Sequence, residues 1–135
     1  MRRFPLLAAL LFVAVLAGCG SGSTKPYTAV ATKACLTQKG FTGVSTAASK
    51  VGFIASFAAN GGLVGKPSSG NVVTIAFTAG PNDVAGTERA FRRAAPASLR
   101  PHMSDIMEAQ GNAVIVWTVS PSSRELSDVQ GCLAA

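Results

Sequence analysis

The sequence predicts an α+β fold of two layers, in which an antiparallel sheet of about four to five strands carries about three helices on one face. Segments with helical spacing of apolar residues stand near both ends and in the middle of the folded region, and β-rich segments lie between them. Several β-rich segments are separated by only a few turn-forming residues, which favours hairpins and hence antiparallel pairing. The chain of 135 residues is long enough for one such domain.

The first predicted helix covers residues 28–39. Thr28 is the expected N-cap, because a threonine hydroxyl accepts hydrogen bonds from the first free amides of a helix. Gly40 marks the other end, where a left-handed residue is common. The residues expected to face the core are Val30, Ala31, Ala34 and Cys35.

Two further helices are predicted in the middle and at the end of the chain. The middle helix opens at residues 80–82 and ends before Pro96, which cannot continue a helix. The last helix begins after Ser122, which forms a capping-box pattern with Glu125. Its inward residues are expected to be Leu126, Val129 and Leu133.

The predicted strands differ in clarity. Residues 71–78 (NVVTIAFT) are the clearest, with β-branched residues and alternation. Residues 105–109 and 113–119 are expected to form a hairpin around Gln110-Gly111-Asn112. Residues 63–64 form a short strand, and residues 51–59 are apolar and strand-like.

The start of the chain has the layout of an export signal. Arg2 and Arg3 are followed by an apolar stretch at residues 6–16, which is too short for a comfortable membrane span. The segment Leu16-Ala17-Gly18-Cys19 then places an aliphatic residue and two small residues before a cysteine. It resembles the lipobox of bacterial lipoproteins. The alternative is an ordinary secretory signal in which the cysteine stands by chance.

The resemblance implies that Cys19 carries a diacylglycerol and becomes the first residue after cleavage behind Gly18. Two acyl chains anchor a protein stably to a membrane. The linker at residues 20–26 has a flexible composition and spans at most about 25 Å, which keeps the domain near the bilayer on the extracytoplasmic side. Beyond this leader, the Ala/Gly-rich composition, the helix–strands–helix pattern and the terminal cysteines resemble those of small lipoproteins of high-GC bacteria, which implies a location and no activity. The expected organisation is a signal peptide at 1–18, a lipidated cysteine and linker at 19–26 and one disulfide-stapled domain at 27–135.

Three cysteines stand in the chain, and lipidation of Cys19 leaves Cys35 and Cys132. These two lie near the ends of the folded region, and an exported protein meets a compartment that allows disulfides. We therefore expect them to pair. Two buried free thiols or a redox pair are the alternatives, although the chain has no C-x-x-C motif.

The composition and motifs do not indicate an enzyme. Without Arg2 and Arg3 the chain keeps ten basic and six acidic residues, a mild excess that is thin evidence for binding nucleic acid. His102 is the only histidine, and with Asp105 and Glu108 it imitates a metal or acid–base cluster at helical spacing, although an exposed loop position is expected. No cofactor or metal is therefore expected.

The predicted function is that of a membrane-anchored, non-enzymatic binding or structural module of the cell envelope, whose partner is an envelope protein or polymer. Arg89, Arg92 and Arg93 fall on one face of the middle helix and form a candidate membrane-facing basic patch, with an ordinary solvated face as the alternative. The alternative function is a carrier of a small molecule or lipid. Its pocket between sheet and helices would be lined by Phe53, Phe57, Phe77 and Trp117.

Overall fold

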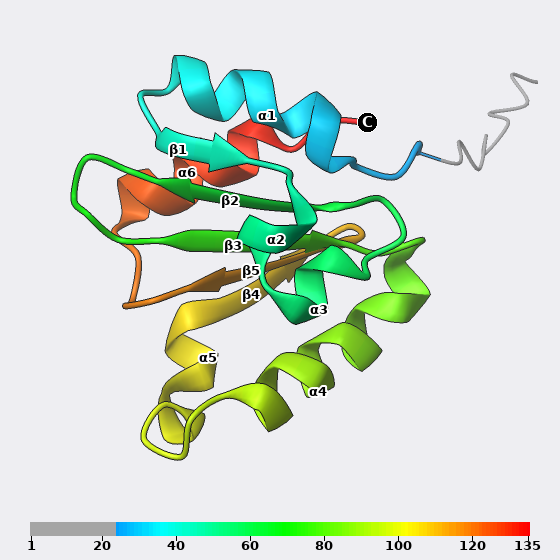
Figure 1. Cartoon of the computed structure of the whole chain (residues 1–135), viewed down its shortest axis with the longest axis vertical. Coiled ribbons are helices and arrows are strands. Elements are labelled where there is room, and N and C mark those ends of the chain that lie inside the picture. Colours follow the sequence, from blue (N-terminus) through cyan, green and yellow to red (C-terminus); the bar gives the residue numbers. More distant parts are fainter. Residues whose placement is uncertain (1–23) are drawn as a thin grey trace, which may run out of the picture.

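The computed structural model describes residues 24–135, so the predicted signal peptide and Cys19 lie outside the described residues. The described chain folds around a five-stranded antiparallel sheet with the strand order β1-β2-β3-β5-β4, accompanied by helices (Figure 1). The predicted α+β class and the antiparallel sheet are confirmed. No helix among these residues is long and apolar enough to cross a membrane.

The elements follow one another in a helix–strand order close to the predicted one. The strands are β1 (Thr42–Ser45), β2 (Gly62–Lys66), β3 (Val73–Phe77), β4 (Met107–Gln110) and β5 (Ala113–Trp117). The helices are α1 (Ala29–Gln38), α2 (Ala48–Val51), α3 (Phe53–Ser56), α4 (Val84–Ala94), α5 (Met103–Ile106) and α6 (Ser123–Cys132). Two short 3₁₀ turns, η1 (Pro81–Asp83) and η2 (Arg100–His102), precede α4 and α5.

The central strands β3 and β5 are apolar on both faces. Ile75 pairs with Ile115, so these two side chains share one face, while Ala76 and Val114 pair on the other. All four side chains are fully buried. Successive side chains of a strand point to opposite faces of the sheet, so a strand that buries all of them needs a covering layer on each side.

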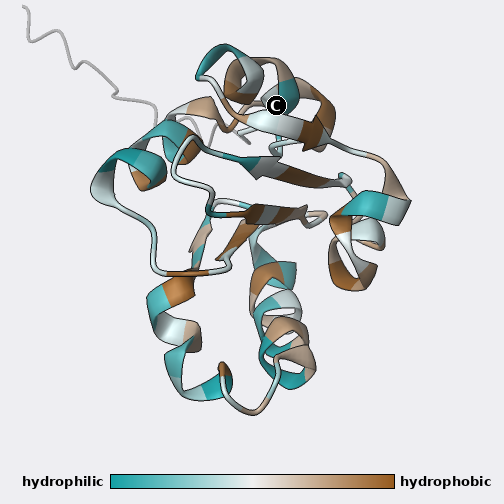
Figure 2. Cartoon of the chain, turned by 60° about the vertical axis from the view of Figure 1, so that its left-hand side comes forward, coloured by the Kyte–Doolittle hydropathy of each residue, from teal (hydrophilic) through white to brown (hydrophobic). Residues whose placement is uncertain are grey.

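The helices accordingly lie on both faces of the sheet, and the expected arrangement with all of them on one face is wrong. In Figure 2 the sheet runs through the middle with helices above and below it. The helices α1 and α6 cover the face of Ile75, and α2, α3 and α4 cover the face of Ala76. A sheet with one solvent-exposed face would show polar residues at every second position of its strands. The strands β3 and β5 lack this pattern, which explains why helices cover both faces.

The inward face of α1 differs from the predicted one. Ala29, Thr32 and Leu36 are its buried residues, whereas Val30 is 78% exposed. The buried threonine is satisfied because its hydroxyl accepts a hydrogen bond from the amide of Ala134 at 3.3 Å. Because the buried face of α1 contains the polar residue Thr32, a prediction from hydrophobicity alone chose the wrong face of the helix. Thr28 caps the helix as expected, and Gly40 follows its end with φ +86°.

The ends of the domain are joined through α1 and α6. Cys35 and Cys132 form a disulfide with Cα atoms 5.4 Å apart, in line with the predicted pairing.

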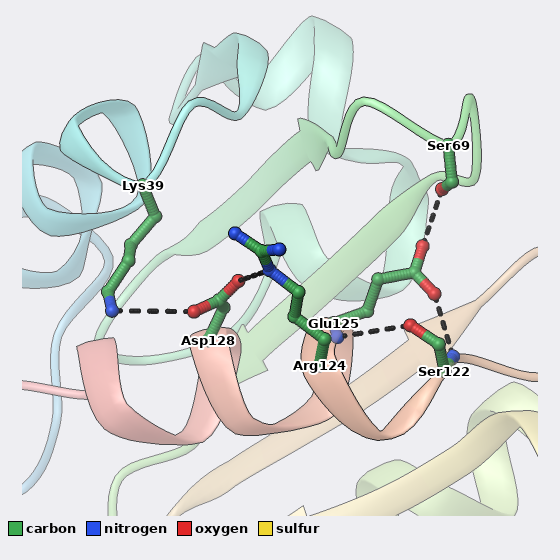
Figure 3. A network of polar contacts seen from close by, with 6 residues as sticks. All are labelled: Lys39, Ser69, Ser122, Arg124, Glu125 and Asp128. Carbon is green, nitrogen blue, oxygen red and sulfur yellow. Dashed lines mark hydrogen bonds and ion pairs between the residues drawn. The ribbon is translucent and has the colours of Figure 1, made fainter.

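Around the start of α6, the Ser122–Glu125 capping box is present as predicted. Figure 3 shows how polar contacts extend from α6 to other elements. Glu125 accepts a hydrogen bond from the hydroxyl of Ser69 at 2.6 Å in the β2–β3 loop, while Asp128 pairs with Lys39 at 3.4 Å and with Arg124 at 3.9 Å.

The strand-like segment 51–59 is instead helical, in two short pieces. Its fully buried residues, Val51 and Ala55, stand four apart, which is a helical spacing. Gly52 has φ +80°, a left-handed conformation that favours glycine and divides α2 from α3. The apolar content of the segment concealed this spacing because its two phenylalanines point outward.

Candidate functional site

An apolar groove lies on the sheet face covered by α2, α3, α4 and α5. It has a volume of about 430 Å³ and opens to solvent. Its lining is contributed by helices and by two central strands, with Thr74 and Thr118 as its hydroxyl groups. The other lining residues are Val51, Gly52, Phe53, Ile54, Phe91, Ala94, Ala95, Pro96, Leu99, Met103, Ile106, Val116 and Trp117.

One wall of the groove is formed by α2 and α3, and a glycine in β2 allows this wall to lie close to the sheet. A Cβ atom at Gly62 of β2 would stand 2.6 Å from the carbonyl oxygen of Ala55, so the absence of a side chain lets α3 lie directly on the sheet. Val51 and Ala55 anchor this wall by burial. Because α2 and α3 have four residues each, the wall is narrow and leaves part of the sheet uncovered.

The opposite wall is α4, a strongly amphipathic helix. Phe91 is half-buried and packs against buried core residues. Val84 is also half-buried and packs against the core. Ala95 is buried directly after the helix, where Pro96 ends it. The chain then returns through α5, whose Met103 and Ile106 are buried and close one end of the groove.

A pair of exposed aromatic rings borders this site. Phe53 and Phe57 are 79% and 75% exposed, and their ring centroids lie 4.9 Å apart in an edge-to-face arrangement. Both rings line a second, shallower hollow of about 360 Å³ that α3 shares with Gly86, Thr87 and Ala90 of α4. Large exposed aromatic side chains on adjacent turns are unusual on a free surface and mark an interaction site.

The four aromatic residues predicted to line a carrier pocket are not brought together. Phe77 is fully buried on the opposite face of the sheet, in the cluster with Ile75. Phe53 lines the groove, and Phe57 lies outside it. Trp117 borders the groove on β5, although its pairing with Val73 places its side chain on the face of Phe77. The sequence reasoning missed Ile54, Leu99, Met103 and Ile106, and the helical spacing of Val51 and Ala55 was the signal that would have placed α3 over the sheet.

The three arginines of the predicted patch are all exposed on α4. Arg89, Arg92 and Arg93 stand on the side of the helix away from Phe91, as expected from their spacing. Between residues 84 and 100 the chain has four arginines and a single acid, Glu88. The wall of the groove therefore has a positive outer side.

His102 lies at the end of the η2 turn, at the exposed position that was expected. It pairs with Asp105 at 3.8 Å, and both side chains are largely exposed. No group of three or more potential metal ligands occurs among residues 24–135. Glu108 lies on β4, where its carboxylate accepts a hydrogen bond from Gln130 at 3.3 Å and burial raises its pKa above the ordinary value.

A smaller polar cleft of about 210 Å³ lies between α5, β4 and the start of α6 and includes Glu108 and Trp117. Within the described chain, the buried Oε1 of Glu108 and Nε1 of Trp117 have no hydrogen-bond partner. Buried polar atoms of this kind commonly bind ordered water. Its small volume leaves little room for an organic ligand.

The comparisons with known proteins leave the site without a counterpart: no family model, curated protein or solved structure matches the chain.

Proposed function

We propose that the chain is an exported, lipid-anchored module of the cell envelope that binds an amphiphilic lipid non-covalently. The observation that supports this most is the open apolar groove between sheet and helices. Its volume of about 430 Å³ falls in the range of about 300–1,000 Å³ typical of small-molecule sites. Of the two functions expected from the sequence, the geometry favours the carrier.

The chemistry of the groove favours a ligand with an acyl chain and an anionic head. Its side chains are predominantly apolar, and the two threonine hydroxyls supply only weak polar contacts. Arg100 donates a hydrogen bond to the carbonyl oxygen of the groove residue Ala95 at 3.0 Å, so positive charge lies next to the groove. Arg93 adds a further positive charge on the outer side of α4. An anionic head group next to the groove stays solvated and gains electrostatic attraction, while burial of the chain contributes most of the affinity.

Trp117 gives a direct test of this function, because it borders the groove and is the only tryptophan in the chain. Residues 24–135, which contain the sheet, both helix layers and the disulfide, would be titrated with dibromostearate, whose bromine atoms quench tryptophan fluorescence at short range. Saturable quenching is expected, and unbrominated oleate should compete with it. Absence of saturable quenching would contradict the proposal.

A pair of variants on the same helix distinguishes the groove from other surfaces. Ala94→Phe places a ring at a lining position and is expected to weaken fatty-acid binding about tenfold by filling the groove. Ala85→Phe adds the same ring at an exposed position of α4 outside the lining and serves as the matched control. If both variants bind equally well, the ligand occupies another site.

The proposed anchor is tested in the full-length chain. Cys19→Ala is expected to abolish incorporation of labelled palmitate and to release the protein from the membrane fraction, because no acyl chain would remain. Retention of both label and membrane association would contradict the lipoprotein assignment. This test is independent of the groove.

A further inference from the structure

The outer surface of α3 and α4 combines exposed aromatic rings with arginines. We propose that this α3–α4 surface, formed by Phe53, Phe57, Arg89 and Arg93, docks the domain on an anionic lipid bilayer, with the two rings entering the interfacial layer. The inference extends the proposed function from what the groove binds to how the domain meets the membrane, and it rests on the proposed anchor only for the orientation of the domain.

The aromatic part of the surface has the properties of an interfacial anchor. The two rings are at least 75% exposed and lie one turn apart, so both present apolar area to the same side of α3. Their shared hollow with Gly86, Thr87 and Ala90 joins them to α4 without intervening charged side chains. Apolar area of this kind gains free energy when it enters the headgroup–acyl boundary.

The arginines stand beside these rings. On a helix of 3.6 residues per turn, Arg93 and Arg89 project away from the sheet, and Arg93 lies nearer the side of Gly86, which faces α3. The guanidinium of Arg89 leans toward Gly86, since a Cβ atom placed there would be 3.9 Å from it. Arg92 projects toward the other side of the helix. Within residues 24–135, none of these arginines forms an ion pair, so their charge is available to phosphate groups.

The exit of the tether lies close to the start of α4. Thr24 and Lys25 share a hollow of about 390 Å³ with Gly80 and Pro81, which lead into that helix. Thr24 stands five positions after Cys19, so a lipid on Cys19 would hold Thr24 within about 18 Å of the bilayer. This short reach brings the α4 side of the domain to the membrane surface.

Docking in this orientation presents the groove to the lipid. Phe53 and Ile54 line both the groove and the aromatic hollow, so the two features open next to each other. An acyl chain leaving the bilayer would meet the groove at the docked surface. A single surface thus serves membrane contact and access to the groove.

The test uses residues 24–135, which lack the tether, so that any vesicle binding comes from the surface itself. Cosedimentation with vesicles of phosphatidylcholine alone would be compared with vesicles containing roughly a third phosphatidylglycerol, at low and at high salt. Binding is expected only to the anionic vesicles, and high salt should weaken it because it screens the arginines. Absence of binding to anionic vesicles at low salt would overturn the proposal.

The variants separate the contribution of the rings from that of the charges. Phe57→Ala is expected to reduce binding about tenfold, and Val30→Ala, an equally exposed apolar residue on α1, should leave it unchanged. Arg89→Gln with Arg93→Gln should reduce binding about fivefold per charge, whereas Lys33→Gln on α1 with Arg124→Gln on α6 removes equal charge from the opposite face of the sheet. Equal losses in the test and control variants would indicate unspecific attraction and overturn the proposal.

The failure of docking and the failure of groove binding remain distinguishable. Phe57 does not line the groove, so Phe57→Ala should bind dibromostearate normally while losing vesicle binding. Ala94→Phe should show the reverse behaviour. Sedimentation velocity provides a further check: if the domain self-associates through Phe57 and loses this on Phe57→Ala, the surface is an interface between copies and the membrane proposal is wrong.

Discussion

The two faces of the sheet are covered in different ways, and the difference separates a closely packed face from one that keeps an open groove. On one face, two helices of ten residues each, α1 and α6, are joined by a disulfide and by an ion pair and pack onto a fully buried core. On the other face, the helices α2, α3 and α5 have only four residues each and leave a groove. Binding surfaces are typically drawn from the less stable part of a fold, because access requires incomplete packing.

The largest expected effect concerns the disulfide on the well-packed face. It joins cysteines 97 positions apart and so restricts nearly the whole unfolded chain. Removing the bond raises the conformational entropy of the unfolded state and thereby destabilises the fold. Cys35→Ala with Cys132→Ala should lower the free energy of unfolding by about 4–5 kcal/mol in urea titrations of residues 24–135. A loss below about 1 kcal/mol would show that the α1–α6 layer does not depend on this bond.

The two faces should respond differently to truncation of an aliphatic side chain. Leu36→Ala on α1 removes a fully buried side chain and is expected to cost about 3 kcal/mol through lost burial and a residual cavity. Ile54→Ala on α3 widens a groove that is already open and should cost about 1 kcal/mol. Equal losses in urea unfolding would contradict the distinction between a packed face and an open one.

Asn112 contributes to stability through polar contacts at the end of the β4–β5 hairpin. Its side chain accepts a hydrogen bond from the amide of Tyr27 and donates to the carbonyl oxygens of Tyr27 and Thr78, at 2.7–2.9 Å. Asn112→Ala removes the side-chain partner of the amide and carbonyl of Tyr27, while the carbonyl of Thr78 keeps its hydrogen bond from Asn60. The substitution should cost about 2–3 kcal/mol, measured by thermal unfolding. In hydrogen-exchange experiments, the variant should lose amide protection mainly in the segment around Tyr27. An equal loss of protection throughout the domain would argue against this role.

The smallest expected effect is the dependence of stability on pH through α6. Hydrogen bonds from Ser69 and from the amide of Ser122 lower the pKa of Glu125 below its ordinary value of 4.5. A lowered pKa in the folded state contributes stability above pH 4.5 that is lost as the pH falls through the folded value. Ser69→Ala should therefore make the acid-induced loss of stability shallower in unfolding experiments between pH 3 and 6. The effect should be a few tenths of a kcal/mol, because Glu125 is only partly buried and solvent screens its interactions.

Glu108 provides the opposite sign in the same experiment. Burial raises its pKa, so its contribution is favourable below pH 4.5 and is lost as the pH rises through the folded value. Glu108→Gln removes this opposing contribution, and the loss of stability at acidic pH should become steeper. A shallower acid response in Glu108→Gln would mean that its carboxylate is stabilised in the fold by charge or hydrogen bonds.

Local patterns were sufficient for much of the fold. The capping residues Thr28 and Ser122, the turn at Gly111 and the strand at 73–77 were all predicted, since each depends on interactions within a few residues. The pairing of Cys35 with Cys132 followed from counting cysteines. Segment 51–59 was misassigned because its apolar composition suits a strand and its helical spacing rests on two residues only.

What the sequence determined by itself was the three long helices, the central strands, their antiparallel pairing and the cysteine pair, because propensity, capping and chain order are local or countable. Only the tertiary structure decided that helices cover both faces, that Phe77 is core while Phe53 and Phe57 are exposed, and that α3 and α4 border a groove. The physical reason is that burial of a side chain depends on what packs against it from distant parts of the chain. Phenylalanines with the same intrinsic hydrophobicity therefore have different roles on opposite faces of one sheet.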